Sequence, residues 1–225
     1  MSAESSLLFQ VPERYRRAVS TLSVFVVWLT YGSVMIGMAS GYTDWFMTKT
    51  PWNQLLCFLL LVLNFPINTR PLAICFVVCF AIGFCAELIG VNTGLLFGVY
   101  HYLPNFGPGM GGVPYLIGTN WAVLGFIAFG VSATLKLTAR SRMVIAALLM
   151  VALDALMEPV AAQFGFWQFA GNEVPIWNYV CWFLVALPMQ YLLLRVKPVI
   201  NNRFCMHLLS ANFIFFLWSN VVHQS

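Results

Sequence analysis

The sequence predicts an all-α membrane protein, a polytopic bundle of about seven transmembrane helices. Three observations support this prediction. Hydrophobic residues make up 61% of the 225-residue chain and charged residues only 8%, which is more apolar surface than a soluble domain of this length buries. The apolar residues form stretches long enough to cross a hydrocarbon core of roughly 30 Å. The basic residues gather between alternate stretches, as cytoplasmic loops do.

The apolar stretches give the expected helices in chain order. We expect spans at 18–39, 52–68, 72–90, 113–136, 143–163, 175–194 and 204–222. Asn64 and Pro66 interrupt the second span, which a tilted or kinked helix can accommodate. The first span follows a basic segment but has the length of a full crossing, so we interpret it as a retained helix and not as a cleaved signal. The chain therefore divides into a basic tail, 1–17, and one transmembrane domain, 18–222.

The distribution of Lys and Arg predicts the orientation of the bundle. With these spans, every Lys and Arg except Lys49 falls on one side of the membrane. Because basic loops stay on the cytoplasmic side, the N-terminus and the tail are predicted to be cytoplasmic. We expect a cell membrane, either the inner membrane of a bacterium or an archaeal membrane. The net charge of +4 reflects this topology, and it gives no indication of nucleic-acid binding.

The six cysteines all fall within the expected spans. Cys75 and Cys79 are four residues apart on one helix, but no His or acidic residue stands at ligand spacing from them. We interpret the cysteines as small packing residues and expect neither a disulfide nor a metal site.

Two stretches, 87–121 and 158–182, share the same order of features. Each begins with a glutamate near the outer end of a helix, continues with a loop of Gly and aromatic residues, and then has Val-Pro at the start of the next helix. In both, a tryptophan stands seven residues after that proline. This order indicates a tandem repeat of a helix pair, with halves of about 72–136 and 143–194, an arrangement in which a site commonly forms between the halves. The alternative is that these residue types simply recur at helix ends.

Three acidic residues, Glu87, Asp154 and Glu158, are expected inside the membrane at a similar depth. Asp154 and Glu158 are four residues apart, which places them on one helix face about 6 Å apart along the axis. Pro159 cannot donate to the carbonyl of Ala155, so it loosens the helix next to Glu158. A buried carboxylate costs several kcal/mol, and no Lys or Arg lies near these acids. We therefore expect at least one of them to be held as the neutral acid.

Polar residues expected at a similar depth, residues of the outer loop that include Tyr100 and His101, and aromatic residues complete a candidate site. An acid surrounded by aromatic rings and little water is suited to protonate an alkene and to shelter the resulting carbocation. The plainer alternatives are structural acids bonded to Asn or backbone groups, Trp and Tyr that line the membrane interface, and a surface His. The candidate residues for binding substrate or water are Asn120, Asn178, His101, Tyr100, Thr93, Trp121, Trp167 and Trp182.

These residues resemble a known family, the polytopic carotenoid biosynthesis proteins. This family includes the gamma-carotene 1'-hydratase of bacteria and the bisanhydrobacterioruberin hydratase of haloarchaea. The resemblance covers roughly residues 83–190 and consists of two motif blocks in the same order. They are Glu87, Gly90, Thr93-Gly94, Phe97-Gly98-Val99-Tyr100, Tyr102, Val113-Pro114 and Trp121, followed by Asp154, Glu158-Pro159, Gly165-Phe166-Trp167, Val174-Pro175, Asn178-Tyr179 and Trp182.

The resemblance implies an enzyme that adds water across the terminal double bond of an acyclic (ψ) carotenoid end, without a cofactor. Its partners would be a carotenoid substrate within the lipid bilayer and other carotenoid enzymes. By this resemblance Glu158 or Asp154 is the general acid, and Glu87 pairs with it or orients the water. The residues that would shape the water site are Asn120, Asn178 and His101.

One departure from the family pattern keeps other functions open. The second block of the family has Asp-Pro where this chain has Glu158-Pro159, which can mark a subgroup with a different substrate or reaction. One alternative is a lycopene-type cyclase, in which an internal alkene captures the same cation. Another is a proton-coupled transporter that uses the three acids as a relay. No lysine falls in the middle of a span, which argues against a retinal protein.

Overall fold

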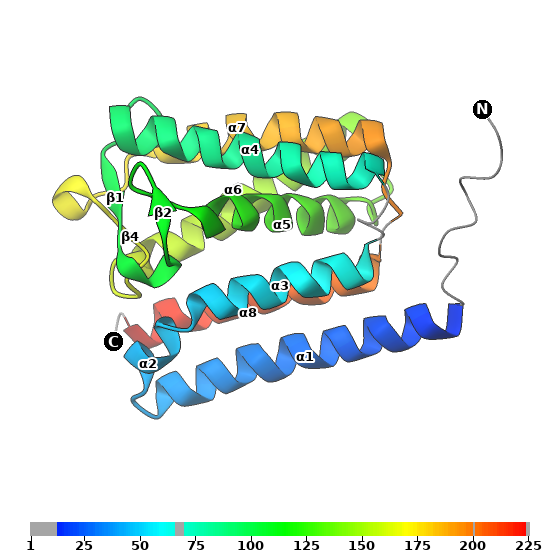
Figure 1. The fold of residues 1–225 in the computed structure, drawn as a ribbon, viewed down its shortest axis with the longest axis horizontal. Coiled ribbons are helices and arrows are strands. Elements are labelled where there is room, and N and C mark those ends of the chain that lie inside the picture. The colour runs from blue at the N-terminus through cyan, green and yellow to red at the C-terminus, as the bar shows by residue number, and fades with distance from the viewer. Residues whose placement is uncertain (1–12, 66–69, 200, 224–225) are drawn as a thin grey trace.

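Long apolar helices form most of the structure, a computed structural model that describes residues 13–65, 70–199 and 201–223 (Figure 1). The helices are α1 (Glu13–Ala39), α2 (Thr43–Met47), α3 (Thr50–Asn64), α4 (Arg70–Thr93), α5 (Tyr115–Ser132), α6 (Ala139–Ala161), α7 (Ile176–Val196) and α8 (Asn202–His223). Each of the seven expected spans overlaps one helix, six of them long and the second, α3, shorter, and the short α2 lies between the first two of these helices. The predicted all-α membrane bundle is therefore confirmed.

The second expected span, 52–68, differs most from its helix. Six of the described helices have the length and apolar composition of a membrane span, whereas α3 is shorter. Its 15 residues extend about 22 Å. The helix ends at Asn64 because Phe65 precedes a proline and is extended, with φ −121° and ψ 138°. Residues 66–68 of the expected span lie outside the described residues.

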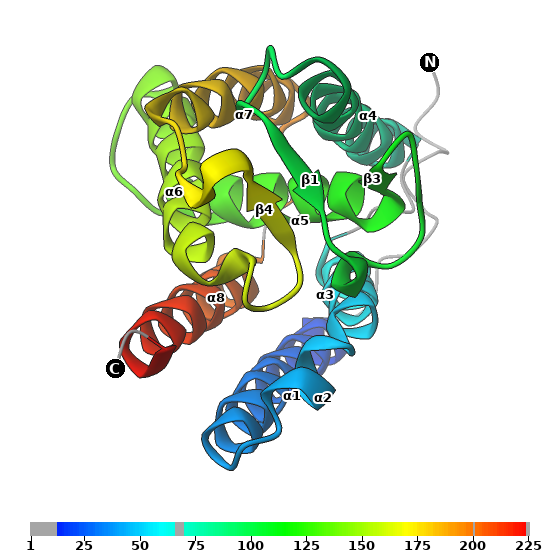
Figure 2. The ribbon, with the colours of Figure 1, turned by 90° about the vertical axis from the view of Figure 1, so that its left-hand side faces the viewer.

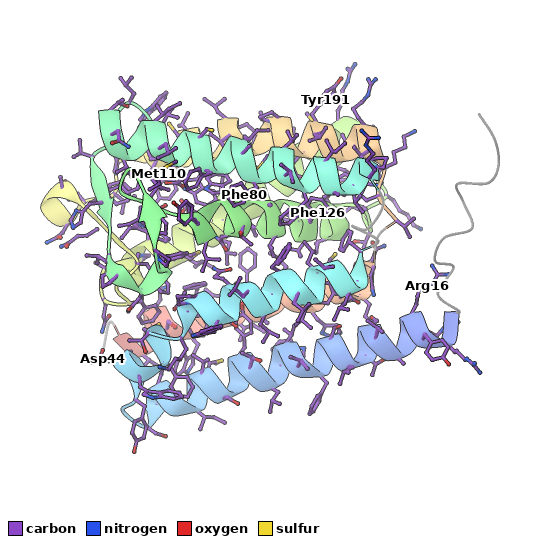
Figure 3. The ribbon with its side chains drawn as sticks, in the orientation of Figure 1. Arg16, Asp44, Phe80, Met110, Phe126 and Tyr191 are labelled. Atoms are coloured by element: carbon purple, nitrogen blue, oxygen red, sulfur yellow. The ribbon has the colours of Figure 1, made fainter. Side chains whose placement is uncertain are left out.

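Helix α5 occupies the centre of the bundle, and α3, α4, α6, α7 and α8 surround it (Figure 2). It is the most deeply buried of the candidate spans, and its small residues allow neighbouring helices to approach closely. Phe126 of α5 points into the bundle, where its ring lies 5.6 Å from that of Phe65 and 5.8 Å from that of Phe76 (Figure 3). Helix α1 packs on the outside, against α3 and α8.

Short strands cover one end of the bundle. Strand β1 follows α4 and pairs in antiparallel register with β4, which follows α6. Figure 2 looks onto this ribbon, which crosses the end of the central helix. The loops after α4 and α6 therefore form one lid over the bundle. The short elements are β1 (Tyr100–Tyr102), β2 (Gly109–Met110), β3 (Val113–Pro114), β4 (Trp167–Phe169) and the 3-10 helices η2 (Pro104–Phe106) and η3 (Ala170–Asn172).

The two predicted halves contact each other through equivalent parts of their sequence blocks. The strands that follow α4 and α6 pair with each other. Trp121 and Trp182, which hold equivalent places in the two sequence blocks, stack with their ring centroids 3.7 Å apart and their planes at 18°. Equivalent residues that meet face to face are expected where two related halves pack symmetrically. The repeat itself stays a prediction.

Candidate functional site

The three intramembrane acids line one small cavity beneath the β1–β4 ribbon. Glu87 comes from α4, and Asp154 and Glu158 come from α6. All three are buried, with exposed fractions of 3%, 0% and 9%. The cavity has a volume of about 20 Å³, which is room for about one water molecule. The expectation from sequence that the acids share one depth therefore agrees with their place in the structure.

Glu87 accepts hydrogen bonds from three side chains. The indole Nε1 of Trp121 donates to Oε1 over 2.8 Å. The hydroxyl of Tyr102 donates to Oε2 over 2.8 Å, and the hydroxyl of Tyr100 donates to the same oxygen. Several donors directed at one carboxyl group stabilise its negative charge. Glu87 is thus held in one position by two loop residues and one residue of the central helix.

Two glycines on α4 make room for these donors. Gly83 and Gly90 lie about one turn before and one turn after Glu87, on the same side of the helix. A Cβ atom on Gly90 would lie 2.9 Å from the hydroxyl oxygen of Tyr100, and one on Gly83 would overlap the ring of Trp121. The absence of side chains at these two positions therefore lets Tyr100 and Trp121 reach the carboxyl group.

Asp154 and Glu158 share one donor. The amide Nδ2 of Asn178 donates to Asp154 Oδ2 over 2.9 Å and to Glu158 Oε1 over 3.0 Å. The indole of Trp167 donates to Glu158 Oε2 over 2.9 Å. Asp154 Oδ1 is buried and has no hydrogen-bond partner within the described ranges. The other three oxygens of these two residues each accept a hydrogen bond.

The hydrogen-bond donors named here are neutral indole, phenol and amide groups. Three carboxyl groups around one cavity repel each other when all are ionised, and neutral donors compensate this repulsion only in part. We therefore expect the cluster to share at least one proton at neutral pH.

Pro159 lies inside α6, but the helix ends two residues later, so the proline affects only the last turn.

The buried site beside Glu87 shifts the pKa of both tyrosines of β1, Tyr100 and Tyr102. Burial, together with the charge of Glu87, raises the pKa of Tyr100 and Tyr102 above their usual value of 10.0. Both hydroxyls therefore stay neutral in the folded protein at a pH where they would ionise in the unfolded chain. Their contribution to stability is fully present below pH 10 and decreases as the pH rises above it.

This pKa shift predicts how stability depends on alkaline pH. The melting temperature in detergent should fall as the pH is raised from about 9 to about 11. The fall should be smaller in the Tyr100→Phe/Tyr102→Phe double variant, which has no hydroxyls to ionise at these positions, although its starting melting temperature is lower. Tyr115→Phe changes an exposed tyrosine and serves as the control. Equal falls in the wild type and the double variant would contradict the prediction.

Five of the eight residues expected to bind substrate or water line the cavity, and four of them come from β1, β4 and α7: Tyr100, Trp167, Asn178 and Trp182. Asn120 also lines it and accepts a hydrogen bond from Gln54 over 3.0 Å. Trp121 lies behind Glu87 and supports it.

The structure does not bring His101 or Thr93 into the cavity. His101 is exposed on β1, because successive side chains of a strand point to opposite faces and its neighbours Tyr100 and Tyr102 point inward. Thr93 lies in the last turn of α4, where its hydroxyl donates to the carbonyl of Ile89. The role expected for His101 at the water site therefore has no structural support.

Sequence reasoning did not include four further residues among the binding residues. Tyr102 and Phe169 face the cavity because β1 and β4 pair. They were not predicted, since strands of three residues show no clear alternation of inward and outward side chains in the sequence. Phe97 and Ile117 complete the lining. The Phe97 ring lies 6.2 Å from Trp121 and 6.5 Å from Trp182, so three aromatic rings back one wall of the cavity.

Comparison with protein families gives one match that covers most of the chain. The model of a family described as carotenoid biosynthesis protein matches residues 53–224. The matched range begins near the start of α3 and contains all three carboxyl groups and the ribbon above them. Comparisons with curated proteins and with solved structures gave no match.

Proposed function

Since the chain belongs to the carotenoid biosynthesis protein family and has a role in making carotenoids, we propose that it adds water across the terminal double bond of an acyclic carotenoid end. One observation carries this proposal. Three buried carboxyl groups enclose a cavity with room for about one water molecule, and one of their oxygens, Asp154 Oδ1, lacks a partner within the described ranges.

Asp154 is the proton donor in this proposal. Its Oδ1 gives a proton to the less substituted carbon of the terminal double bond, which leaves a tertiary carbocation on the other carbon. Glu158 accepts two N–H hydrogen bonds and is the better candidate for a charged carboxylate. It removes a proton from the water molecule as the oxygen bonds to the carbocation.

The atoms and charges balance over one turnover. The alkene gains one hydrogen and one hydroxyl group, Asp154 has lost a proton, and Glu158 has gained one. A proton transfer from Glu158 to Asp154, one helical turn away, restores the starting state. The addition changes no net oxidation state, so the proposed reaction needs no redox cofactor.

The surroundings of the acids favour hydration over cyclisation. The rings of Phe97, Trp167 and Trp182 face the cavity and stabilise a cation through their π-systems. The amides of Asn120 and Asn178 also face it and give a water molecule hydrogen-bond partners. A cyclase would be expected to surround the cation with apolar groups alone.

The proposal is tested by expression in cells that accumulate lycopene, an acyclic carotenoid, followed by chromatography and mass spectrometry of the extracted pigments. The expected result is a pigment heavier than lycopene by one water molecule per reacted end. A pigment of unchanged mass with a shifted absorption spectrum would instead indicate a cyclase. Unchanged lycopene in cells with well-expressed protein would contradict a reaction at this end group.

A further inference from the structure

A second and much larger cavity lies next to the carboxyl groups. Its volume is about 450 Å³, which is within the range of small-molecule binding sites. It lies between α1, α2 and α3 on one side and α5, α6 and α8 on the other. The polar side chains of its wall include Tyr31, Asn53 and Gln54. Much of the remaining wall is apolar and includes Leu56, Val123, Leu124, Ile127, Leu153 and Phe215.

The two cavities share a wall. Asn120 of α5 lines both of them. On α6, Leu153 and Met157 line the large cavity, and the residues that directly follow them, Asp154 and Glu158, line the small one. Two adjacent faces of α6 therefore line the two cavities. A molecule in the large cavity lies next to the carboxyl groups.

The large cavity opens between α1, α2 and α3. Leu29, Trp45 and Trp52 line it there and are exposed, with exposed fractions of 56%, 58% and 71%. In a membrane, an apolar residue such as Leu29, on the span α1, faces the lipid. An apolar molecule dissolved in the bilayer can therefore enter from the side without crossing water.

We propose that the large cavity binds the isoprenoid chain of the carotenoid and that the terminal double bond reaches Asp154 past the hydrogen-bonded pair of Gln54 and Asn120. This inference rests on the proposed function. The small cavity has room for about one water molecule, so the carbon atoms of the substrate must come from a neighbouring space. The large cavity adjoins it through Asn120 and has the apolar wall that a hydrocarbon chain requires.

The length of the substrate agrees with an open cavity. A carotenoid is about as long as the hydrocarbon core of a bilayer, roughly 30 Å. Only one end of such a molecule fits within the cavity, and the rest extends through the opening into the lipid. The reaction at one end is therefore independent of the structure at the other end, so carotenoids with different distal ends are expected to be accepted.

Two leucines on α3 provide a matched test. Leu56 lines the large cavity, whereas its neighbour Leu55 does not and is 43% exposed on the outside. Leu56→Trp fills part of the cavity, and Leu55→Trp makes the same change on the lipid side.

Val34→Trp narrows the cavity from the peripheral helix α1, with Ile36→Trp as its exposed control. This second pair covers the case in which Leu56→Trp disturbs the packing of α3.

Two measurements are made on each purified variant: the lycopene retained per protein molecule, and KM and kcat for its conversion. We expect Leu56→Trp and Val34→Trp to retain about tenfold less lycopene and to raise KM about tenfold with a small change in kcat, which corresponds to about 1.4 kcal/mol of binding. Leu55→Trp and Ile36→Trp should behave as the wild type does.

The two readouts separate the failure of this inference from the failure of the proposed function. In one outcome, the wild type retains lycopene without converting it, while the Leu56→Trp and Val34→Trp variants retain less. That result supports binding of the isoprenoid chain in the large cavity and contradicts hydration of lycopene. If the Leu56→Trp and Val34→Trp variants retain and convert lycopene as the controls do, the large cavity is not the binding site of the isoprenoid chain, whereas hydration is supported. A wild type that retains no lycopene would also overturn the inference.

Discussion

Replacing Asp154 by asparagine is expected to reduce turnover by about 10²–10⁴-fold, the usual contribution of a general acid. Asparagine has the same shape as aspartic acid but cannot deliver a proton to an alkene. Its oxygen can still accept the hydrogen bond from Asn178, so the bundle should fold. The measurement is the rate of the water adduct from lycopene, normalised to purified protein.

The matched control for this variant is Asp44→Asn, which makes the same change in an exposed acid on α2. It should leave turnover unchanged. If Asp154→Asn keeps more than about a tenth of the wild-type rate, Asp154 is not the proton donor, because the loss would fall below the usual range for a general acid.

Replacing Glu158 by glutamine is expected to change the product as well as the rate. Asp154 still protonates the alkene, but the carboxylate of Glu158 is no longer present to accept the proton of the attacking water, so this proton has to return to the ionised Asp154. The yield of the water adduct should fall about 10²-fold. Part of the carbocation should instead lose a proton from a neighbouring carbon to the ionised Asp154 and give an isomer of unchanged mass.

Chromatography of the pigments distinguishes the two roles. An isomer formed by Glu158→Gln but not by Asp154→Asn supports Asp154 as the acid and Glu158 as the base. The reverse pattern would exchange the two assignments. Glu173→Gln, in an exposed loop, is the control for the glutamate change and should give only the water adduct.

The helices were predictable because each apolar stretch is as long as a membrane span. The second expected span, 52–68, differs from its helix at Phe65, which is extended because it precedes a proline. The spacing of Asp154 and Glu158 predicts a common helix face, and the structure has both on the same cavity. Glu87 joins them because its helix reaches the same depth from the other half of the chain.

The lid over the acids was beyond prediction from one sequence. Strands of three residues are too short to show an alternating pattern, so Tyr102 and His101 could not be assigned to the inner and outer faces. The large cavity was also beyond prediction, since it depends on how α1, α2 and α3 pack against α5, α6 and α8. The sequence of α1 and α3 shows only general hydrophobicity, which gives no indication of a cavity.

The central claim, that the carboxyl cavity adds water to a carotenoid end, is tested most directly by isotope incorporation. Purified protein in detergent would convert lycopene in deuterium oxide enriched in oxygen-18, and mass spectrometry would locate the labels in the product. The predicted product carries one carbon-bound deuterium and one oxygen-18 hydroxyl group for each reacted end. A product that contains solvent deuterium without solvent oxygen, or oxygen from another source, would contradict the claim.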